Sequence, residues 1–507
     1  MDEQEAGLRQ RALSEKLSKL SPAKRALLEK RIQGVSTDTA QLHATSQIKP
    51  VQRTGELPLS LAQQTVLQYL WFTPGALHVS YAKCYRLTGP FSHEILKRSL
   101  EELARRHEIL RTTFPLRDGK PTQVIARRMQ PELPVIDLRD IPESERVEEA
   151  VRILGGELER PYDLATEPLW RARLVQLGER DFMLLLAMDH LIADDWAMNL
   201  LVRDGLILYQ AFSQGFPSPL DDPPIQYADF AYWQSQRLQG KSLETLRDYW
   251  GKQLEGIKLW SEFRLPFERI SFSPSSNVRA ADHSLRLTDT LTDSLKDLGR
   301  RHGATLFMTI LATLVALLHR YTGEEDIAIP STTANRHRPE TRELMGWLSD
   351  LLVFRFRLNG IGTFKELLQH VRAVVLEAGD YQDLPFGKFP GFNENWWVEA
   401  TYPSIRFTMR AESEEMPRLS EQPDPSGSSE LTIIPVEHPY FNTQNVIKPG
   451  MTFYVAEEGG SLNVRVTYEI ERYESAEIAL MLEDLRALAE MVVVSPDQLL
   501  AELPRSI

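Results

Sequence analysis

The chain has 507 residues, of which 42% are hydrophobic and 25% are charged, a composition typical of a folded globular protein. This length exceeds what one hydrophobic core usually serves, so the sequence predicts two substantial lobes. The 71 acidic residues outnumber the 58 basic ones and give a net charge of −13, which argues against nucleic acid or an anionic membrane surface as the main partner.

Residues 1–57 are predicted to form a helical leader followed by a linker. Residues 1–33 have leucines at helix-compatible spacings, and Ser21-Pro22 begins a second short helix that ends at Gly34. The segment is either a loosely packed leader or a docking segment that presents the body of the chain to a partner protein. It lacks an apolar export core, and no run of about 18 apolar residues follows anywhere, so we expect neither secretion nor a membrane span.

From residue 58 onward the pattern becomes mixed α/β. A stretch rich in proline, glycine and aromatic residues around 213–240 divides a first lobe, 58–238, from a second lobe, 239–507, and a polar surface excursion is expected at 412–429. Apolar periodicity predicts helices over 92–107, 200–212 and 305–321, and strands over 82–87, 172–177, 182–188, 326–330, 352–358 and 462–468.

Cys84 is the single cysteine of the chain, so no internal disulfide is possible. No cysteine–histidine cluster offers a metal site, and this usage fits a reducing cytoplasm. Cys84 lies in an alternating segment and is expected to pack as a small side chain rather than to act as a nucleophile.

The most informative segment is DHLIADD, residues 189–195, which directly follows the apolar run 182–188. Open α/β folds commonly place ligand-handling groups where a buried strand ends. His190 can transfer a proton at neutral pH, and the neighbouring carboxylates can orient or tune it. The alternative is a packing histidine, with Asp194 or Asp195 serving only as the N-cap of the next helix.

Further segments extend this pattern over most of the chain. They are PLSLAQQ at 58–64, RHEILRTTF at 106–114, YW at 249–250, ANRHRPE at 334–340, MGWLSD at 345–350 and YQDLPF at 381–386. In this order, and with residues 189–195 at the place of an HHxxxDG motif, they resemble the condensation domains of nonribosomal peptide synthetases.

The resemblance implies two lobes, each like chloramphenicol acetyltransferase, that meet in a V around a central tunnel. Carrier proteins on the donor and acceptor sides would deliver substrates on 4′-phosphopantetheine arms, and the chain would hold no cofactor or metal of its own. An acceptor amine would attack a donor thioester and form an amide, or an acceptor alcohol would form an ester, in nonribosomal peptide or hybrid polyketide biosynthesis. The substrates would be supplied in trans or by a longer assembly line. We expect three residues to line the tunnel, namely Trp196, Ser349 and Asp350.

The resemblance also implies individual roles. His190 matches the histidine that positions or deprotonates the amine. Asp194 matches an acid that orients the motif through an ion pair with a second-lobe arginine, for which Arg336 is the candidate.

Two positions depart from the family pattern. Asp189 replaces the first histidine, and a carboxylate close to His190 would raise the imidazole pKa, which weakens a base and strengthens an acid or electrostatic role. We therefore include Asp189 with His190 as a catalytic candidate. Asp195 replaces the glycine, and its side chain is expected either to narrow the channel or to change which substrate fits.

Two alternatives to amide formation stay open. Asp189 and Asp194 have the DxxxxD spacing of heterocyclisation domains, although Ala197 stands where those domains have serine. A condensation-like domain can also recruit a tailoring enzyme without turnover, but known examples have lost the histidine that is retained here as His190.

Other polar residues are assigned weaker or structural roles. His107 and Arg111 are expected to brace the first lobe, and His319 to pack on a buried helix. The pair Trp396-Trp397 suits either a tunnel wall or a core. Arg336 and Arg338 could meet a phosphate of the carrier arm, but ion pairing is the commoner fate of such residues.

Overall fold

The computed structural model describes residues 47–54, 56–72, 80–257, 263–269, 279–390, 405–410, 431–438, 441 and 450–502. The predicted leader helices, the pair Trp396-Trp397 and the excursion at 412–429 lie outside these residues.

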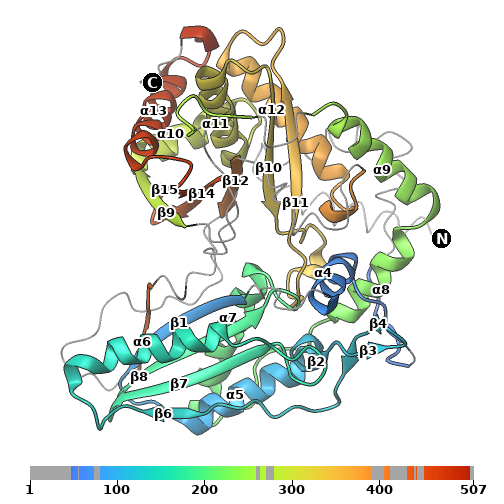
Figure 1. The fold of residues 1–507 in the computed structure, drawn as a ribbon, viewed down its shortest axis with the longest axis vertical. Coiled ribbons are helices and arrows are strands. Elements are labelled where there is room, and N and C mark those ends of the chain that lie inside the picture. The colour runs from blue at the N-terminus through green and yellow to red at the C-terminus, as the bar shows by residue number, and fades with distance from the viewer. Residues whose placement is uncertain are drawn as a thin grey trace, which may run out of the picture.

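The first lobe is built on a five-stranded sheet with the order β13-β1-β8-β7-β6 (Figure 1). Antiparallel pairs join β1, β8 and β7, and β6 runs parallel to β7. The strands are β1 (Ser80–Thr88), β6 (Val135–Asp137), β7 (Trp170–Gly178), β8 (Asp181–Asp189) and β13 (Thr432–Pro435).

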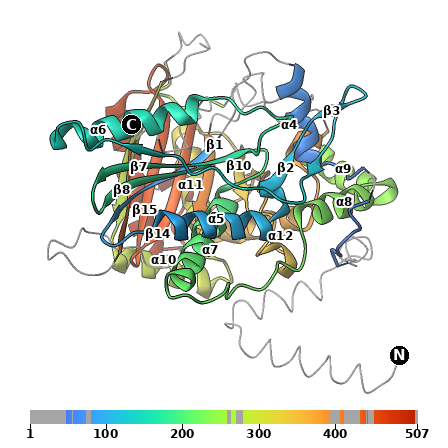
Figure 2. The same ribbon diagram turned by 90° about the horizontal axis from the view of Figure 1, so that it is seen from below.

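Helices cover both faces of this sheet, which explains the continuous apolar run of β8. Helices α5 (His93–Arg106) and α7 (Asp195–Ser213) pack on one face, where Leu103 and Met188 share a core cluster. Helix α6 (Glu143–Glu159) covers the opposite face through Leu154 (Figure 2).

The second lobe contains a six-stranded sheet with the order β11-β10-β12-β14-β15-β9. Its helices are α10 (Asp289–Arg301), α11 (Leu306–Thr322), α12 (Phe364–Asp380) and α13 (Ser475–Val494). Helix α11 is apolar on nearly every side because it is enclosed by the sheet and the other helices. The strands are β9 (Ala280–Leu287), β10 (Asp326–Thr333), β11 (Asp350–Arg357), β12 (Ile405–Arg410), β14 (Met451–Glu458) and β15 (Ser461–Glu469).

Helices α4 (Leu61–Phe72), α8 (Tyr227–Arg237) and α9 (Gly240–Leu254) lie along the side where the two lobes are joined (Figure 1). The remaining short elements are strands Thr112–Thr113, Leu116–Arg117, Lys120–Pro121 and Val124–Ile125, and 3-10 turns Glu108–Arg111, Pro339–Thr341, Phe386–Lys388 and Leu500–Glu502.

The first lobe takes in segments from the later part of the chain, which a boundary at residue 238 did not include. Strand β13 comes from the later part of the chain but pairs with β1, with Tyr85 opposite Pro435. In the same direction, Leu344, Met345 and Leu348 pack into the core of the first lobe. Each lobe is therefore not a continuous piece of sequence.

The prediction of a mixed α/β fold in two lobes is confirmed, and the predicted helices and strands match observed elements. Cys84 is buried, and burial raises its thiol pKa to about 12, which agrees with a packing role. No single helix among the described residues is long and apolar enough to cross a membrane, and α10 with α11 meets that test only as a pair bent by 100°.

Candidate functional site

His190 lies in the tight connection between strand β8 and helix α7. The backbone N–H of Ile192 donates to Asp189 O at 3.1 Å, and that of Ala193 donates to His190 O at 3.4 Å. The segment that the sequence singled out is therefore a strand-to-helix turn.

The orientation of the His190 ring is set by a backbone carbonyl. His190 Nδ1 lies 2.7 Å from Ala193 O, which can only accept a hydrogen bond, so the network assigns the proton of the neutral ring to Nδ1 and the lone pair to Nε2. The ring packs edge-on against Tyr81, with centroids 5.1 Å apart, and lies 4.3 Å from the ring of Trp347. Because Tyr81 and Trp347 come from different lobes, His190 lies where the lobes meet.

Asp194 is almost completely buried and holds several groups together. Its carboxylate caps α7 by accepting from Ala197 N at 2.8 Å. It also accepts from the backbone N–H groups of Leu348 and Ser349 at 3.0 and 2.9 Å, and from Arg336 at 3.1 and 3.2 Å. The ion pair expected between Asp194 and Arg336 is therefore present, within a larger set of hydrogen bonds.

Arg336 in turn fixes the loop that carries Trp347. Its guanidinium donates to the carbonyl oxygens of Leu344 and Gly346, both at 3.2 Å. Gly346 has φ 149°, and a Cβ there would lie 2.0 Å from the ring of Tyr227, so glycine is required. The Tyr227 hydroxyl donates to Trp347 O at 2.7 Å, which completes the support of this loop.

Asp189 is 2% exposed, and Asp189 Oδ1 accepts from Leu191 N at 2.8 Å. Tyr162 lies near this carboxylate; burial raises the tyrosine pKa, and the charge of Asp189 contributes in the same direction. Asp189 thus stabilises the turn that carries His190.

Asp195 is partly exposed and forms an ion pair with Arg410 of strand β12 at 3.0 Å. The side chains of Asp195 and Arg410 are 38% and 52% exposed, so this second contact between the lobes is open to solvent.

Trp196 lines a cavity of about 450 Å³ beside this turn. The indole N–H of Trp196 donates to Arg342 O at 2.9 Å. Ser349 and Asp350, which were also expected in the tunnel, lie outside the lining of this cavity. The lining residues are Trp196, Thr333, Ala334, Asn335, Arg336, His337, Arg342 and Gln382.

The Asp350 carboxylate holds two backbone N–H groups. Its carboxylate accepts from Leu351 N at 2.8 Å and from Phe386 N at 3.2 Å. Burial raises its pKa to about 7, and the two backbone donors oppose this shift.

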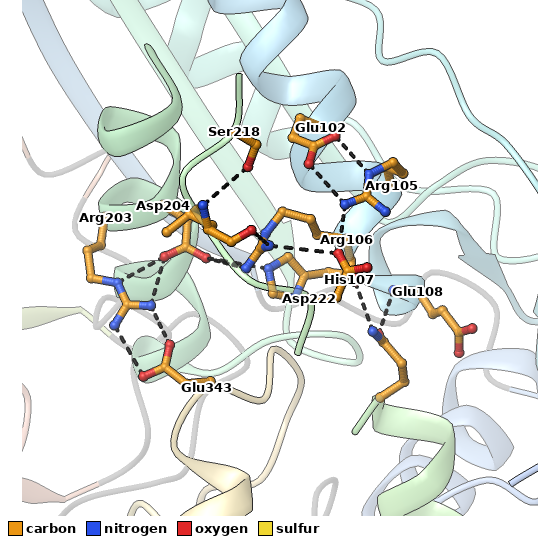
Figure 3. A network of polar contacts seen from close by, with 12 residues as sticks. Glu102, Arg105, Arg106, His107, Glu108, Arg203, Asp204, Ser218, Asp222 and Glu343 are labelled. Carbon is orange, nitrogen blue, oxygen red and sulfur yellow. Dashed lines mark hydrogen bonds and ion pairs between the residues drawn. The ribbon is translucent and has the colours of Figure 1, made fainter. Parts of the chain in front are cut away.

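His107 takes part in a polar network of the first lobe (Figure 3). It is buried, with Nε2 3.6 Å from Asp204 Oδ2, and burial lowers its pKa. Asp204 pairs with Arg203 at 2.7 Å, and Arg203 also binds Glu343 of the second lobe. This network braces α5, α7 and the loop before Trp347.

The other sequence candidates have local partners. Arg111 donates to Ala104 O at 3.1 Å, and His319 Nδ1 lies 2.8 Å from Glu324 O. Arg338 pairs with Asp383 at 3.2 Å and covers the ring of Trp233. The described residues contain no group of three His, Cys, Asp or Glu side chains placed to hold a metal ion.

Sequence reasoning missed Tyr81 and Arg410 as neighbours of the site. Tyr81 could have been found as the residue of the alternating strand that faces the same side as Tyr85. No local signal marks Arg410, because it meets Asp195 only through the packing of the two lobes.

Comparisons with known proteins show which family the chain resembles. A family model described as Condensation domain matches residues 53–505. A component of the linear gramicidin synthase of Brevibacillus parabrevis is 35% identical over 462 residues, which is 90% of this chain and 6% of that protein. Phosphinothricin tripeptide synthetase PhsC of Streptomyces viridochromogenes is 34% identical over 499 residues, which is 97% of this chain and 44% of that protein. The chain thus spans less than half of either relative.

Solved structures show the same fold. The X-domain in its complex with OxyB from teicoplanin biosynthesis has a TM-score of 0.74 at 23% identity, covering 92% of this chain and 99% of that one. The first condensation domain of the calcium-dependent antibiotic synthetase, in complex with a substrate analogue, has a TM-score of 0.66 at 17% identity, covering 90% and 100%. Since the family model spans nearly the whole of the sequence, this chain belongs to the condensation-domain family.

Proposed function

We propose that this chain is a condensation-type acyl transferase, which joins a carrier-bound acyl or aminoacyl thioester to an acceptor amine. The observation that carries the proposal is the orientation of His190. Its Nδ1 is engaged by Ala193 O at 2.7 Å, and its ring is held between aromatic side chains of both lobes. A neutral imidazole fixed in this way presents the Nε2 lone pair as a proton acceptor.

In the proposed step, the amine nitrogen attacks the thioester carbonyl, a C–N bond forms and the C–S bond breaks. His190 Nε2 either accepts the proton that the amine loses or positions the amine for attack. In both cases the proton ends on the departing thiol. Holding two tethered substrates together supplies most of the acceleration as effective concentration.

The supporting residues act through position. Asp194 and Arg336 fix the loop of Trp347 against His190, and Asp189 holds the turn from which His190 projects. We assign carrier proteins on both sides as partners, with substrates on 4′-phosphopantetheine, residues 1–57 as a docking segment, and the cytoplasm as the location.

A turnover assay with loaded carrier proteins tests the role of His190. We expect His190→Ala to lose at least about 100-fold in kcat, the lower range of general acid–base catalysis. His319→Ala, which alters a histidine bonded to Glu324 O at the end of α11, is the matched control and should stay active. Equal product from wild type and His190→Ala would contradict the proposal.

Turnover by Asp189→Asn tests the role of Asp189. The amide oxygen of asparagine can still accept from Leu191 N, so the turn is kept. A large loss of kcat would support a catalytic role, whereas turnover equal to wild type would restrict Asp189 to holding the turn.

A second candidate function is recruitment of a partner enzyme without turnover. It is favoured by the fold likeness to the X-domain, whose structure was solved in complex with OxyB. Tight binding of a cytochrome P450 by this chain, together with no product from any loaded carrier pair, would support recruitment over condensation.

Heterocyclisation through Asp189 and Asp194 fits the contacts less well. Asp194 already accepts from Ala197, Leu348, Ser349 and Arg336, and it is 1% exposed. Product mass separates the two reactions, because ring closure removes one more water than amide formation.

A further inference from the structure

Four polar side chains from both lobes form a cluster, which we call the Lys83 cluster: Lys83, Asp195, Asn199 and Arg410. Lys83 Nζ donates to Asn199 Oδ1 at 2.5 Å, and Asp195 binds Arg410 at 3.0 Å. Strand alternation places Lys83 on the same face of β1 as Tyr81, which packs against His190.

The charges of the Lys83 cluster do not balance. Lys83 is partly buried, and its hydrogen-bond acceptor Asn199 is neutral. Asp195 is the carboxylate that acts on Lys83, and the same carboxylate is bound by Arg410, which repels Lys83. Burial lowers the pKa of Lys83, and Asp195 opposes this shift. Among the described residues of the cluster, two cations thus share one anion, and buried charges are normally paired.

The second-lobe side of the cluster is also basic. In β12, Phe407 belongs to the core beneath the helices, so alternation turns Arg406 and Arg410 to the other face of the sheet. On the same face of β14 and β15, the guanidinium of Arg465 lies 5.2 Å from the ring centroid of Tyr454. Tyr454 and Arg410 both act electrostatically on Tyr81, so this face reaches the region of His190.

We propose that Lys83 and Arg410 bind a carboxylate on the side chain of a substrate, and that this site selects an acidic residue of the aspartate or glutamate type. This proposal deepens the proposed function and rests on it for the statement that the bound carboxylate belongs to a substrate. Because a strand rises about 3.3 Å per residue, Lys83 lies about 6.6 Å further along β1 than Tyr81. That offset suits a carboxylate several bonds from the reacting amine better than an α-carboxylate.

Binding measured by isothermal titration calorimetry tests the site without turnover. The probes are N-acetyl-glutamic acid α-amide, which carries a side-chain carboxylate, and N-acetyl-glutamine amide, its neutral isostere. We expect binding of the acid to exceed that of the amide by about tenfold or more, the range of a charge-assisted hydrogen bond. Lys83→Met and Arg410→Gln should each remove most of this difference.

Asp195→Asn provides a gain of binding, because it removes the anion that competes for Arg410. It should tighten binding of the acid several-fold and leave the neutral amide unaffected, while Lys97→Met, at an exposed position of α5, serves as the matched control. Equal binding of the two probes, no binding of the acid to wild type or Asp195→Asn, or stronger binding of N-acetylglycine would each overturn the proposal.

This experiment separates the two proposals. A chain that binds the acid but gives no condensation product retains the carboxylate site and loses the proposed function. A chain that condenses neutral and acidic substrates equally, and shows no preference between the probes, retains the function and loses the site.

Discussion

The carbonyl oxygen of Ala193 lies 2.7 Å from His190 Nδ1, and this contact exists because residues 189–194 form a tight turn between β8 and α7. A buried carboxylate at each end holds the turn: Asp189 bonds to Leu191 N, and Asp194 bonds to Ala197 N. The acids around the histidine, which the sequence suggested as tuning groups, therefore also fix the backbone that orients it.

Asp350 gives a pH-dependent prediction at the residue scale. Its pKa is raised by burial from 3.8 to about 7. Between these values the native state holds a proton that the unfolded state has released, so the free energy of unfolding falls as pH rises through this window. Asp350→Asn removes the ionisation and keeps an oxygen for the N–H groups of Leu351 and Phe386.

We therefore expect the stability of Asp350→Asn relative to wild type to rise between about pH 4 and pH 7, the window set by these two pKa values, measured by urea unfolding at each pH. Asp293→Asn, at a carboxylate that is 74% exposed on α10, is the control. A difference between Asp350→Asn and wild type that stays constant with pH would show that Asp350 is not protonated in the native state.

At the scale of elements, the N-terminus of α7 is held by the loop that precedes β11. Asp194 caps the helix and also accepts hydrogen bonds from Leu348 N, Ser349 N and Arg336. One carboxylate thus couples the start of a first-lobe helix to a second-lobe loop, and Trp347 of that loop packs on His190.

A double-mutant cycle on Asp194 and Arg336 tests this coupling. Asp194→Ala should cost about 3–5 kcal/mol of unfolding free energy, because it leaves the Arg336 guanidinium buried without its anion. Arg336→Met should cost less, because Asp194 still caps α7, and the double variant should lose less than the sum of the two, measured by urea unfolding. Additive losses would mean that the ion pair contributes nothing beyond the two separate residues.

Local sequence predicted the elements well where local rules apply. The apolar run of β8 and the start of α5 after Ser92, whose side chain accepts from Ile95 N, were both readable from residues close in sequence. The pairing of β13 with β1 was not, since Tyr85 and Pro435 are far apart in the chain and β13 is short. The family motifs located His190 from residues close in sequence. The contact between Asp195 and Arg410 could not be predicted, because these residues are far apart in the chain and meet only when the lobes pack.

At the scale of the whole molecule, the lobes are connected by more than their covalent linkage. Ion pairs join Asp194 to Arg336, Asp195 to Arg410 and Arg203 to Glu343 across the two lobes. Two segments from the later part of the chain also pack in the first lobe: β13 extends the first sheet, and residues 344–348 fill part of the first core.

Because the first lobe needs β13 and residues 344–348, we predict that residues 47–257 do not form a stable lobe by themselves. Such a fragment leaves the edge of β1 unpaired and leaves empty the space filled by Leu344, Met345 and Leu348. We expect it to lack a cooperative thermal transition by circular dichroism and to bind a hydrophobic dye. Appending residues 431–438 through a flexible linker restores the β13 pairing, and it should raise the melting temperature, whereas a scrambled octapeptide should not. If the bare fragment unfolded cooperatively at the melting temperature of the full chain, the first lobe would not need the segments from the later part of the chain. It would then be an independent domain that holds α7 and His190 without support from the second lobe.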